Sequence, residues 1–148
     1  MLNTSGKNTS AAAWAGVLAN VPLFQGLSQR HLRKVAEKAT TKRYAPLAPI
    51  VRAGDAGDAF FVILDGNASV RKAGKRTVKL GAGDFFGELA LLDAAPRSAT
   101  VQADTEVLVM RLGRTAFQKV LESEPKVGIA MLHVLAARAR ESSRSPAD

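Results

Sequence analysis

Two side chains of opposite charge, Glu88 and Arg97, stand nine positions apart in the stretch GDFFGELALLDAAPRSAT, residues 83–100. A guanidinium presents a fixed fork of donors that suits a phosphate, and it stays charged at physiological pH. A carboxylate is a poor ligand for an anion but a good acceptor for a hydroxyl group. The pair therefore suits one small ligand that carries both an anionic group and a hydroxyl. Alternatively, the two residues form a salt bridge between two turns.

Small residues flank both charged side chains. Gly87 and Ala90 lie beside the glutamate, and Ser98 and Ala99 follow the arginine. Such residues allow the main chain to approach a ligand closely. The apolar run after Gly87 predicts one helical turn, whose first N–H groups favour an anion. The stretch therefore has the features of an anion-binding loop.

The elements that must position this loop are predicted from periodicity and turn residues. From Tyr44 onward, short β-rich runs alternate with Gly/Asp turns, which is typical of an antiparallel barrel or sandwich. Ser28 is a predicted helix N-cap, and Pro125 begins a long helix predicted over residues 126–141. We therefore predict an α+β fold, an antiparallel, jelly-roll-like β-roll flanked by N-terminal and C-terminal helices. The predicted strands cover residues 50–52, 59–64, 68–72, 77–80 and 105–112.

The domain boundaries follow from length and from the polar ends. A chain of 148 residues suits one domain with its own core. We predict this domain over residues 13–142. The small and polar segments 1–12 and 143–148 are predicted to be disordered tails.

The stretch FFGELALLDAAPRSAT resembles the phosphate-binding cassette of cyclic nucleotide-binding domains. Within this family, the sequence resembles the bacterial cAMP sensors, and in particular the regulatory domain of bacterial cyclic nucleotide-gated channels. The segments PLFQGLS and GDAGDAFFVILDG resemble the family's N-terminal helical segment and its early strand-turn-strand signature, so the resemblance covers residues 14–142. It implies cyclic AMP as the ligand and a signal given by rearranging helices. It implies no catalytic residue, no metal and no cofactor.

The resemblance also implies a role for individual residues. Arg97 pairs with the phosphate, and Glu88 with the Gly87 amide holds the ribose 2′-hydroxyl. Relatives that prefer cyclic GMP often have threonine where this chain has Ser98, and those that prefer cyclic AMP often have alanine. Because serine keeps a hydroxyl group, we expect weak discrimination, with cyclic AMP preferred and cyclic GMP bound more weakly. The other implied contacts are to the phosphate from Ala90, Ser98 and Ala99, and to the base from Val78, Leu80 and Arg138.

Alternatives stay open for the base contacts, and one turn departs from the family pattern. Val78 and Leu80 equally suit the core, and Arg138 equally suits a solvated helix surface. The family often has a Pro-Gly-Glu turn after the first helix. Here the segment YAPLAPIV has two prolines and no glycine, which predicts a reshaped turn.

Composition narrows the classes of function. The net charge of +8 comes from basic residues that scatter along the chain, which favours solvated surface charge, so we do not expect nucleic acid as a partner. There is no cysteine, and the two histidines lie far apart, which disfavours a metal-dependent enzyme of the cupin kind. No apolar run is long enough to span a membrane, and no signal peptide is recognised, so we expect a cytoplasmic protein. The effector is unknown. The remaining alternatives are a nucleic-acid-binding regulator with a basic surface and a ligand-free β-roll interaction module.

Overall fold

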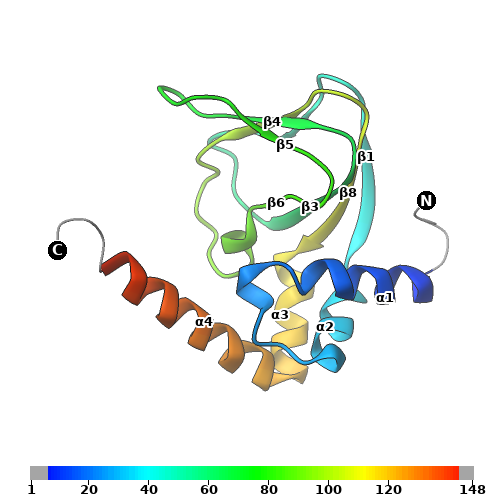
Figure 1. Ribbon diagram of the computed structural model, residues 1–148, viewed down its shortest axis with the longest axis vertical. Helices are drawn as coiled ribbons and strands as arrows, with labels where there is room; N and C mark the ends of the chain where they lie inside the picture. The colour runs from blue at the N-terminus through cyan, green and yellow to red at the C-terminus, as the bar shows by residue number, and fades with distance from the viewer. Residues whose placement is uncertain (1–6, 144–148) are drawn as a thin grey trace. The chain divides into compact units, whose positions relative to one another are not determined.

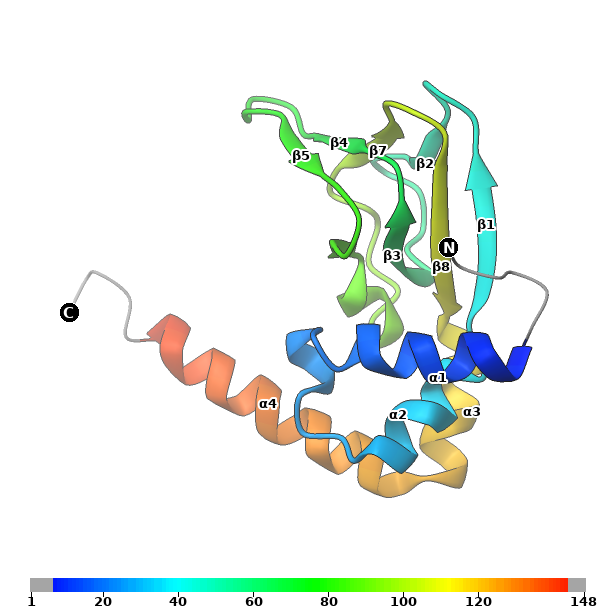
Figure 2. The ribbon, with the colours of Figure 1, turned by 45° about the vertical axis from the view of Figure 1, so that its right-hand side comes forward.

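A computed structural model describes residues 7–143 of the chain (Figures 1 and 2). The chain divides into two compact units. We call residues 39–117 the β unit, and the segments up to residue 38 and from residue 118 onward the helical unit. Helices come first and last in sequence, with antiparallel sheets between them, which confirms the predicted α+β class.

The helical unit is built from segments of both ends of the chain. The side chain of Ser28 caps α2 as predicted, since its Oγ accepts a hydrogen bond of 3.2 Å from the N–H of His31. Helix α1 packs against α2, and α4 packs against η1. None of the described helices is long and apolar enough to cross a membrane. The helices are α1 (Lys7–Leu18), η1 (Pro22–Phe24), α2 (Gln29–Ala36), α3 (Arg114–Ser123), which begins in the β unit, and α4 (Pro125–Ser143).

One carboxylate joins α2 to the turn between α3 and α4. Glu124 accepts hydrogen bonds of 2.9 and 3.2 Å from the guanidinium of Arg30, and His31 Nε2 lies 3.6 Å from the same carboxylate. The hydrogen bonds from Arg30 hold the pKa of Glu124 below its ordinary value, although partial desolvation opposes them. This pair helps to close the helical unit at neutral pH.

The β unit consists of two four-stranded antiparallel sheets. One has the strand order β1-β8-β3-β6 and the other the order β2-β7-β4-β5. Apolar side chains from both sheets, among them Phe61, Ile63, Val101 and Val109, pack in one buried cluster. The strands are β1 (Thr40–Tyr44), β2 (Pro49–Val51), β3 (Ala59–Asp65), β4 (Ala68–Arg71), β5 (Val78–Leu80), β6 (Phe85–Phe86), β7 (Thr100–Ala103) and β8 (Val107–Gly113), and the short 3-10 helix η2 (Glu88–Leu91) follows β6.

The five predicted strands all occur, as β2, β3, β4, β5 and β8, with ends within two residues of those predicted. Strands β1, β6 and β7 were not predicted. The sequence of β1, TTKRY, has no apolar alternation, and its place is set by backbone pairing with β8. Strand β6 has two residues, too few to show a period.

The predicted disordered tail is wrong over residues 7–12, because α1 begins at Lys7. The run Ala11–Ala13 accounts for this, since alanine has the highest helix propensity. Helix α4 likewise extends to Ser143, two residues beyond the predicted end. The rest of the two predicted tails, residues 1–6 and 144–148, lies outside the described residues.

The turn YAPLAPIV, for which the sequence predicts a reshaped conformation, contains a residue with a positive φ. Leu47 takes the left-handed conformation with φ of 71°, the region that glycine adopts most easily. Its N–H donates a hydrogen bond of 2.7 Å to the carbonyl of Ala103, and its side chain is 70% exposed. The backbone bond therefore fixes the turn, while the leucine side chain contributes little burial.

Candidate functional site

The cassette begins at a glycine that the geometry requires. Gly87 follows β6 with φ of 79°, a conformation that L-residues with side chains adopt at a cost. A Cβ atom there would collide with the guanidinium of Arg97 and lie 3.0 Å from the carbonyl oxygen of Ala59. The chain then forms η2, the short helical turn predicted from the apolar run.

The backbone of Arg97 is fastened to the loop that joins β2 to β3. Its N–H donates to the carbonyl of Asp55 at 2.7 Å, and its carbonyl accepts from the N–H of Gly54 at 2.8 Å. One step earlier, Pro96 forms an isolated antiparallel bridge with Ala56. These contacts place the arginine beside β3, although more than thirty residues separate the two segments in sequence.

The side chain of Arg97 is half-buried and retains unused donors. Its Nη2 donates a hydrogen bond of 2.6 Å to the carbonyl of Ala59, and the guanidinium carbon lies 5.7 Å from the centre of the Phe61 ring. Within residues 7–143, its Nε and Nη1 have no protein acceptor, and no carboxylate forms a salt bridge with it. Desolvation lowers the pKa of Arg97, Asp58 opposes this effect, and Arg111 adds to it. A partly desolvated cation with free donors is suited to bind an anion.

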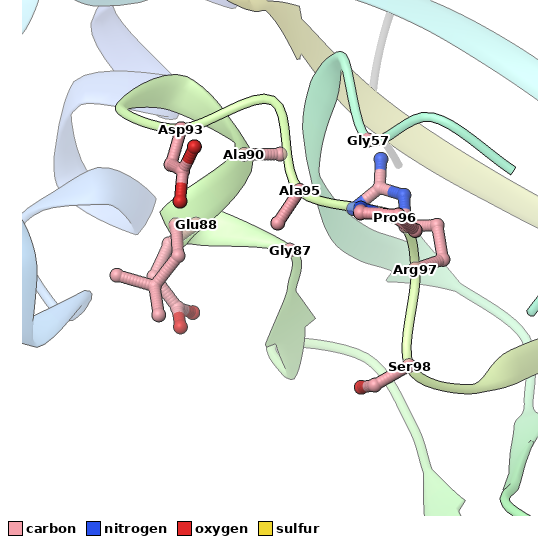
Figure 3. A pocket seen from close by; sticks show the side chains of 10 residues that line it. Gly57, Gly87, Glu88, Ala90, Asp93, Ala95, Pro96, Arg97 and Ser98 are labelled. Atoms are coloured by element: carbon pink, nitrogen blue, oxygen red, sulfur yellow. The ribbon is translucent and has the colours of Figure 1, made fainter. Parts of the chain in front are cut away.

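A cavity of about 380 Å³ lies along the cassette (Figure 3). Glu88 borders it half-buried, and across residues 7–143 its carboxylate has neither a hydrogen bond nor an ion pair. The alternative of a salt bridge between Glu88 and Arg97 is therefore not what the structure shows. In Figure 3 the Arg97 side chain extends toward Gly57, and the Ser98 side chain lies apart from it. The lining residues are Gly57, Gly87, Glu88, Leu89, Ala90, Asp93, Ala95, Pro96, Arg97 and Ser98.

Arg97 also borders a second cavity, of about 220 Å³, on the side of β1 and β8. Lys42, Arg52 and Arg111 contribute further positive charge to its lining, together with the carboxylates of Asp55 and Asp58. Arg111 is held by Asp58 at 3.7 Å. Of the arginines that line this cavity, Arg97 is the one that also lines the first.

Backbone N–H groups of the cassette differ in availability. The N–H of Ala90 donates to the Gly87 carbonyl at 3.0 Å, so an anion contact there requires this bond to open or to be shared. In the described part of the chain, no hydrogen bond is found for the N–H groups of Ser98 and Ala99. These two groups are therefore free to donate.

Of the predicted site residues, five border the same cavity: Gly87, Glu88, Ala90, Arg97 and Ser98. The predicted base contacts are more dispersed. Val78 is 53% exposed, and Leu80 packs against the apolar cluster between the sheets. Neither lines the cavity. Arg138 is exposed on α4, in the other unit, so its predicted contact with the base stays a prediction.

Sequence reasoning did not assign a role to Arg114, the first residue of α3. Its Nη1 donates to the carbonyls of Gly57 at 2.7 Å and Ala90 at 3.3 Å, and its N–H donates to the carbonyl of Asp58 at 2.8 Å. It therefore ties two walls of the cavity to the start of α3. Asp93 and Gly57 were also missed. The repeated GD turns around Gly57 were the available signal for that residue.

Within residues 7–143, no group of three or more His, Cys, Asp or Glu side chains is placed to hold a metal ion. The groups around the cavity are therefore one cation, two carboxylates without a partner in residues 7–143, Glu88 and Asp93, and free backbone donors.

Comparison with known proteins identifies the family of this chain. The family described as "Cyclic nucleotide-binding domain" matches residues 41–124. This chain belongs to that family.

The chain is 44% identical over 106 residues to a cAMP-dependent protein kinase regulatory subunit of Colletotrichum orbiculare. The aligned segment covers 70% of this chain and 27% of the relative. It is 36% identical over 137 residues to a cyclic nucleotide-gated potassium channel of Rhizobium etli, covering 78% of this chain and 38% of the channel. It is also similar to the crystal structure of the N-terminal domain of a Streptomyces coelicolor transcriptional regulator, with a TM-score of 0.76 and 31% identity over 86% of this chain and 92% of that one. The chain thus spans well under half of the two curated relatives.

Proposed function

We propose that the cassette binds cyclic AMP, with cyclic GMP binding more weakly, and that the chain serves as a regulatory module rather than an enzyme. The observation that carries the proposal is Arg97: a half-buried guanidinium with free Nε and Nη1 donors beside a cavity. The regulatory role is supported by the name of the fungal relative, a cAMP-dependent kinase regulatory subunit. The effector of this chain stays unknown, and its cytoplasmic location stays a prediction.

The phosphate and the ribose have separate recognition groups in this proposal. Arg97 binds the phosphate through its free donors, and the N–H groups of Ser98 and Ala99 complete the cradle. Ala90 joins them if its bond to Gly87 opens. Glu88, whose carboxylate is unpaired, accepts a hydrogen bond from the ribose 2′-hydroxyl.

Titration calorimetry with cyclic AMP, cyclic GMP and linear AMP tests this function. Cyclic AMP is expected to bind most tightly. Linear AMP is expected to bind poorly, because its dianionic, freely rotating phosphate does not match a cradle shaped for a cyclic diester. Equal affinity for linear and cyclic AMP would contradict the proposal. Absence of any heat of binding, checked by a second method, would favour the alternative of a ligand-free interaction module.

We further propose that the signal is carried by α4. The helix exposes apolar side chains, with Ile129 at 53% and Leu132 at 63% exposure, so part of its apolar surface lacks cover within the helical unit. Arg138 over the purine would add a cation–π contact of about 0.5–2 kcal/mol in the bound state alone. Amide hydrogen exchange over residues 126–141 tests this proposal. Cyclic AMP is expected to slow exchange there in the wild type and less so in Arg138→Ala. Unchanged exchange in the wild type would exclude α4 as the moving part.

A further inference from the structure

The hairpin formed by β4, β5 and the turn between them carries most of the excess positive charge of the chain. Residues 67–83 contain five basic side chains and no acidic one. Since the net charge is +8, all other residues together account for +3, that is 8 minus 5. Along the sequence the basic residues look scattered, yet this segment concentrates their excess. The five are Arg71, Lys72, Lys75, Arg76 and Lys79.

The hairpin projects away from the rest of the β unit in both views (Figures 1 and 2). Pairing between the strands ends at Val70 and Val78, and the tip is closed by a hydrogen bond of 3.0 Å from the N–H of Lys75 to the carbonyl of Lys72. Residues 71–79 are all exposed. A Cβ added at Gly74 would meet no atom within 4 Å, so the tip lies in open space.

Four of the five cations form no salt bridge within residues 7–143, although the charge of Arg71 helps to lower the pKa of Asp104. Lys79 lies 3.4 Å from Asp104, whereas Arg71, Lys72, Lys75 and Arg76 form no salt bridge with any described residue. Like charges beside one another on a hairpin are destabilising. Lysines on an edge strand discourage aggregation, and β5 is an edge strand. Protection against aggregation accounts for Lys79, which lies on β5. It does not account for the cations beyond Val70 and Val78, where the pairing of β4 with β5 ends.

We propose that this hairpin is a contact surface for double-stranded nucleic acid, bound through its phosphates. A two-stranded β-ribbon fits the major groove of B-DNA, and unpaired Arg and Lys side chains displace counterions from phosphates. The tip between Arg71 and Val78 holds a single apolar side chain, that of Ala73, so it lacks the large apolar residues that enter a lipid surface. The site is separate from the cassette and does not depend on the nucleotide function. It revises the expectation that nucleic acid is not a partner.

Fluorescence anisotropy of the full chain with a labelled DNA duplex tests the proposal. With about four phosphate contacts, raising KCl from about 50 to about 200 mM should weaken binding by about 150-fold. The hairpin variant should lose most of the affinity at the lower salt and most of the salt dependence. It carries the substitutions Arg71→Ala, Lys72→Ala, Lys75→Ala and Arg76→Ala.

A matched control variant separates the effect of the hairpin cations from the effect of a lower net charge. The control variant removes four exposed cations of the helical unit that have no salt bridge with any described residue, so both variants reduce the net charge from +8 to +4. It should keep the affinity and salt slope of the wild type. Its substitutions are Arg33→Ala, Lys38→Ala, Lys119→Ala and Lys126→Ala.

Three results would overturn the proposal. The first is that wild type fails to bind duplex at about 50 mM KCl, well below the salt at which non-specific binding weakens. The second is that both variants lose affinity equally, which assigns binding to diffuse charge. The third is that the hairpin variant loses binding to phosphatidylserine vesicles while the wild type binds those vesicles and not DNA. Circular dichroism of both variants confirms that they are folded.

Discussion

Replacing Arg97 with alanine should abolish most of the affinity for cyclic AMP. The guanidinium has free donors on Nε and Nη1, enough for two charge-assisted hydrogen bonds to a phosphate. Loss of one partner from a buried charge pair costs about 2–5 kcal/mol, which corresponds to roughly 30- to 5,000-fold in affinity. Because Arg97 is only half-buried, we expect a loss in the lower part of this range.

The substitution also acts on the free protein, and this effect must be measured separately. Arg97→Ala removes the hydrogen bond to the Ala59 carbonyl and the contact with the Phe61 ring, together about 1–2 kcal/mol. Relief of the desolvated charge offsets part of this loss. A thermal unfolding curve therefore accompanies each titration. Arg97→Lys should recover little affinity, because a single ammonium does not reproduce the two-pronged donor geometry.

Arg111→Ala is the matched control for charge. Arg111 lies 3.7 Å from Asp58 and borders the second cavity but not the one along the cassette. Calorimetry with cyclic AMP should show an affinity within about threefold of wild type, or about 0.65 kcal/mol. If Arg97→Ala stays folded and binds within the same margin, Arg97 is not the phosphate ligand. If Arg111→Ala loses as much as Arg97→Ala, the effect is one of overall charge.

Three further predictions concern other residues. Glu88→Ala should weaken cyclic AMP binding by about 1.5–3 kcal/mol and should discriminate less than wild type between cyclic AMP and its 2′-deoxy analogue; equal discrimination in both proteins would remove Glu88 from the ribose role. Leu47→Gly should raise the free energy of unfolding by up to about 1 kcal/mol, because it relieves a positive φ at an exposed side chain; a denaturant titration that shows lower stability would refute this. Because the pKa of Glu124 is lowered in the folded state, its ionised carboxylate stabilises the fold at pH values above the ordinary glutamate pKa of about 4.3. This stabilisation is lost as the pH falls through the lowered pKa, so Glu124→Gln should be less stable than wild type at pH 7, and the difference in stability should shrink in acid. A difference in stability that does not depend on pH would exclude the contact with Arg30.

The parts of the fold that the sequence predicts are those with a recognisable apolar pattern, either periodic or a continuous run. Strand β8 is predicted because VLVM is apolar on both faces, and all four residues are buried. Strand β1 has no such pattern, and it exists because its backbone pairs with β8 from Thr40↔Arg111 to Tyr44↔Val107. Backbone pairing carries no side-chain signature, so edge strands of this kind escape sequence reasoning.

The same distinction holds for the site. Glu88, Arg97 and their small neighbours lie within one short stretch of sequence, so their spacing alone indicates an anion-binding loop. The contribution of Arg114 could not be found in this way, because it acts on the carbonyls of Gly57 and Ala90. Any residue type offers such carbonyls, and only the folded chain brings them to one guanidinium.

The central claim is that the cassette between Gly87 and Thr100 holds the cyclic nucleotide. Backbone-amide NMR of the full chain during a cyclic AMP titration tests it most directly. The account predicts that the largest shift changes occur at residues 87–90 and 98–100, with the free N–H groups of Ser98 and Ala99 among them. Arg97→Ala should abolish these changes at the same nucleotide concentration. Changes confined to residues 71–79, or no change within the cassette at a concentration that saturates binding, would contradict the account.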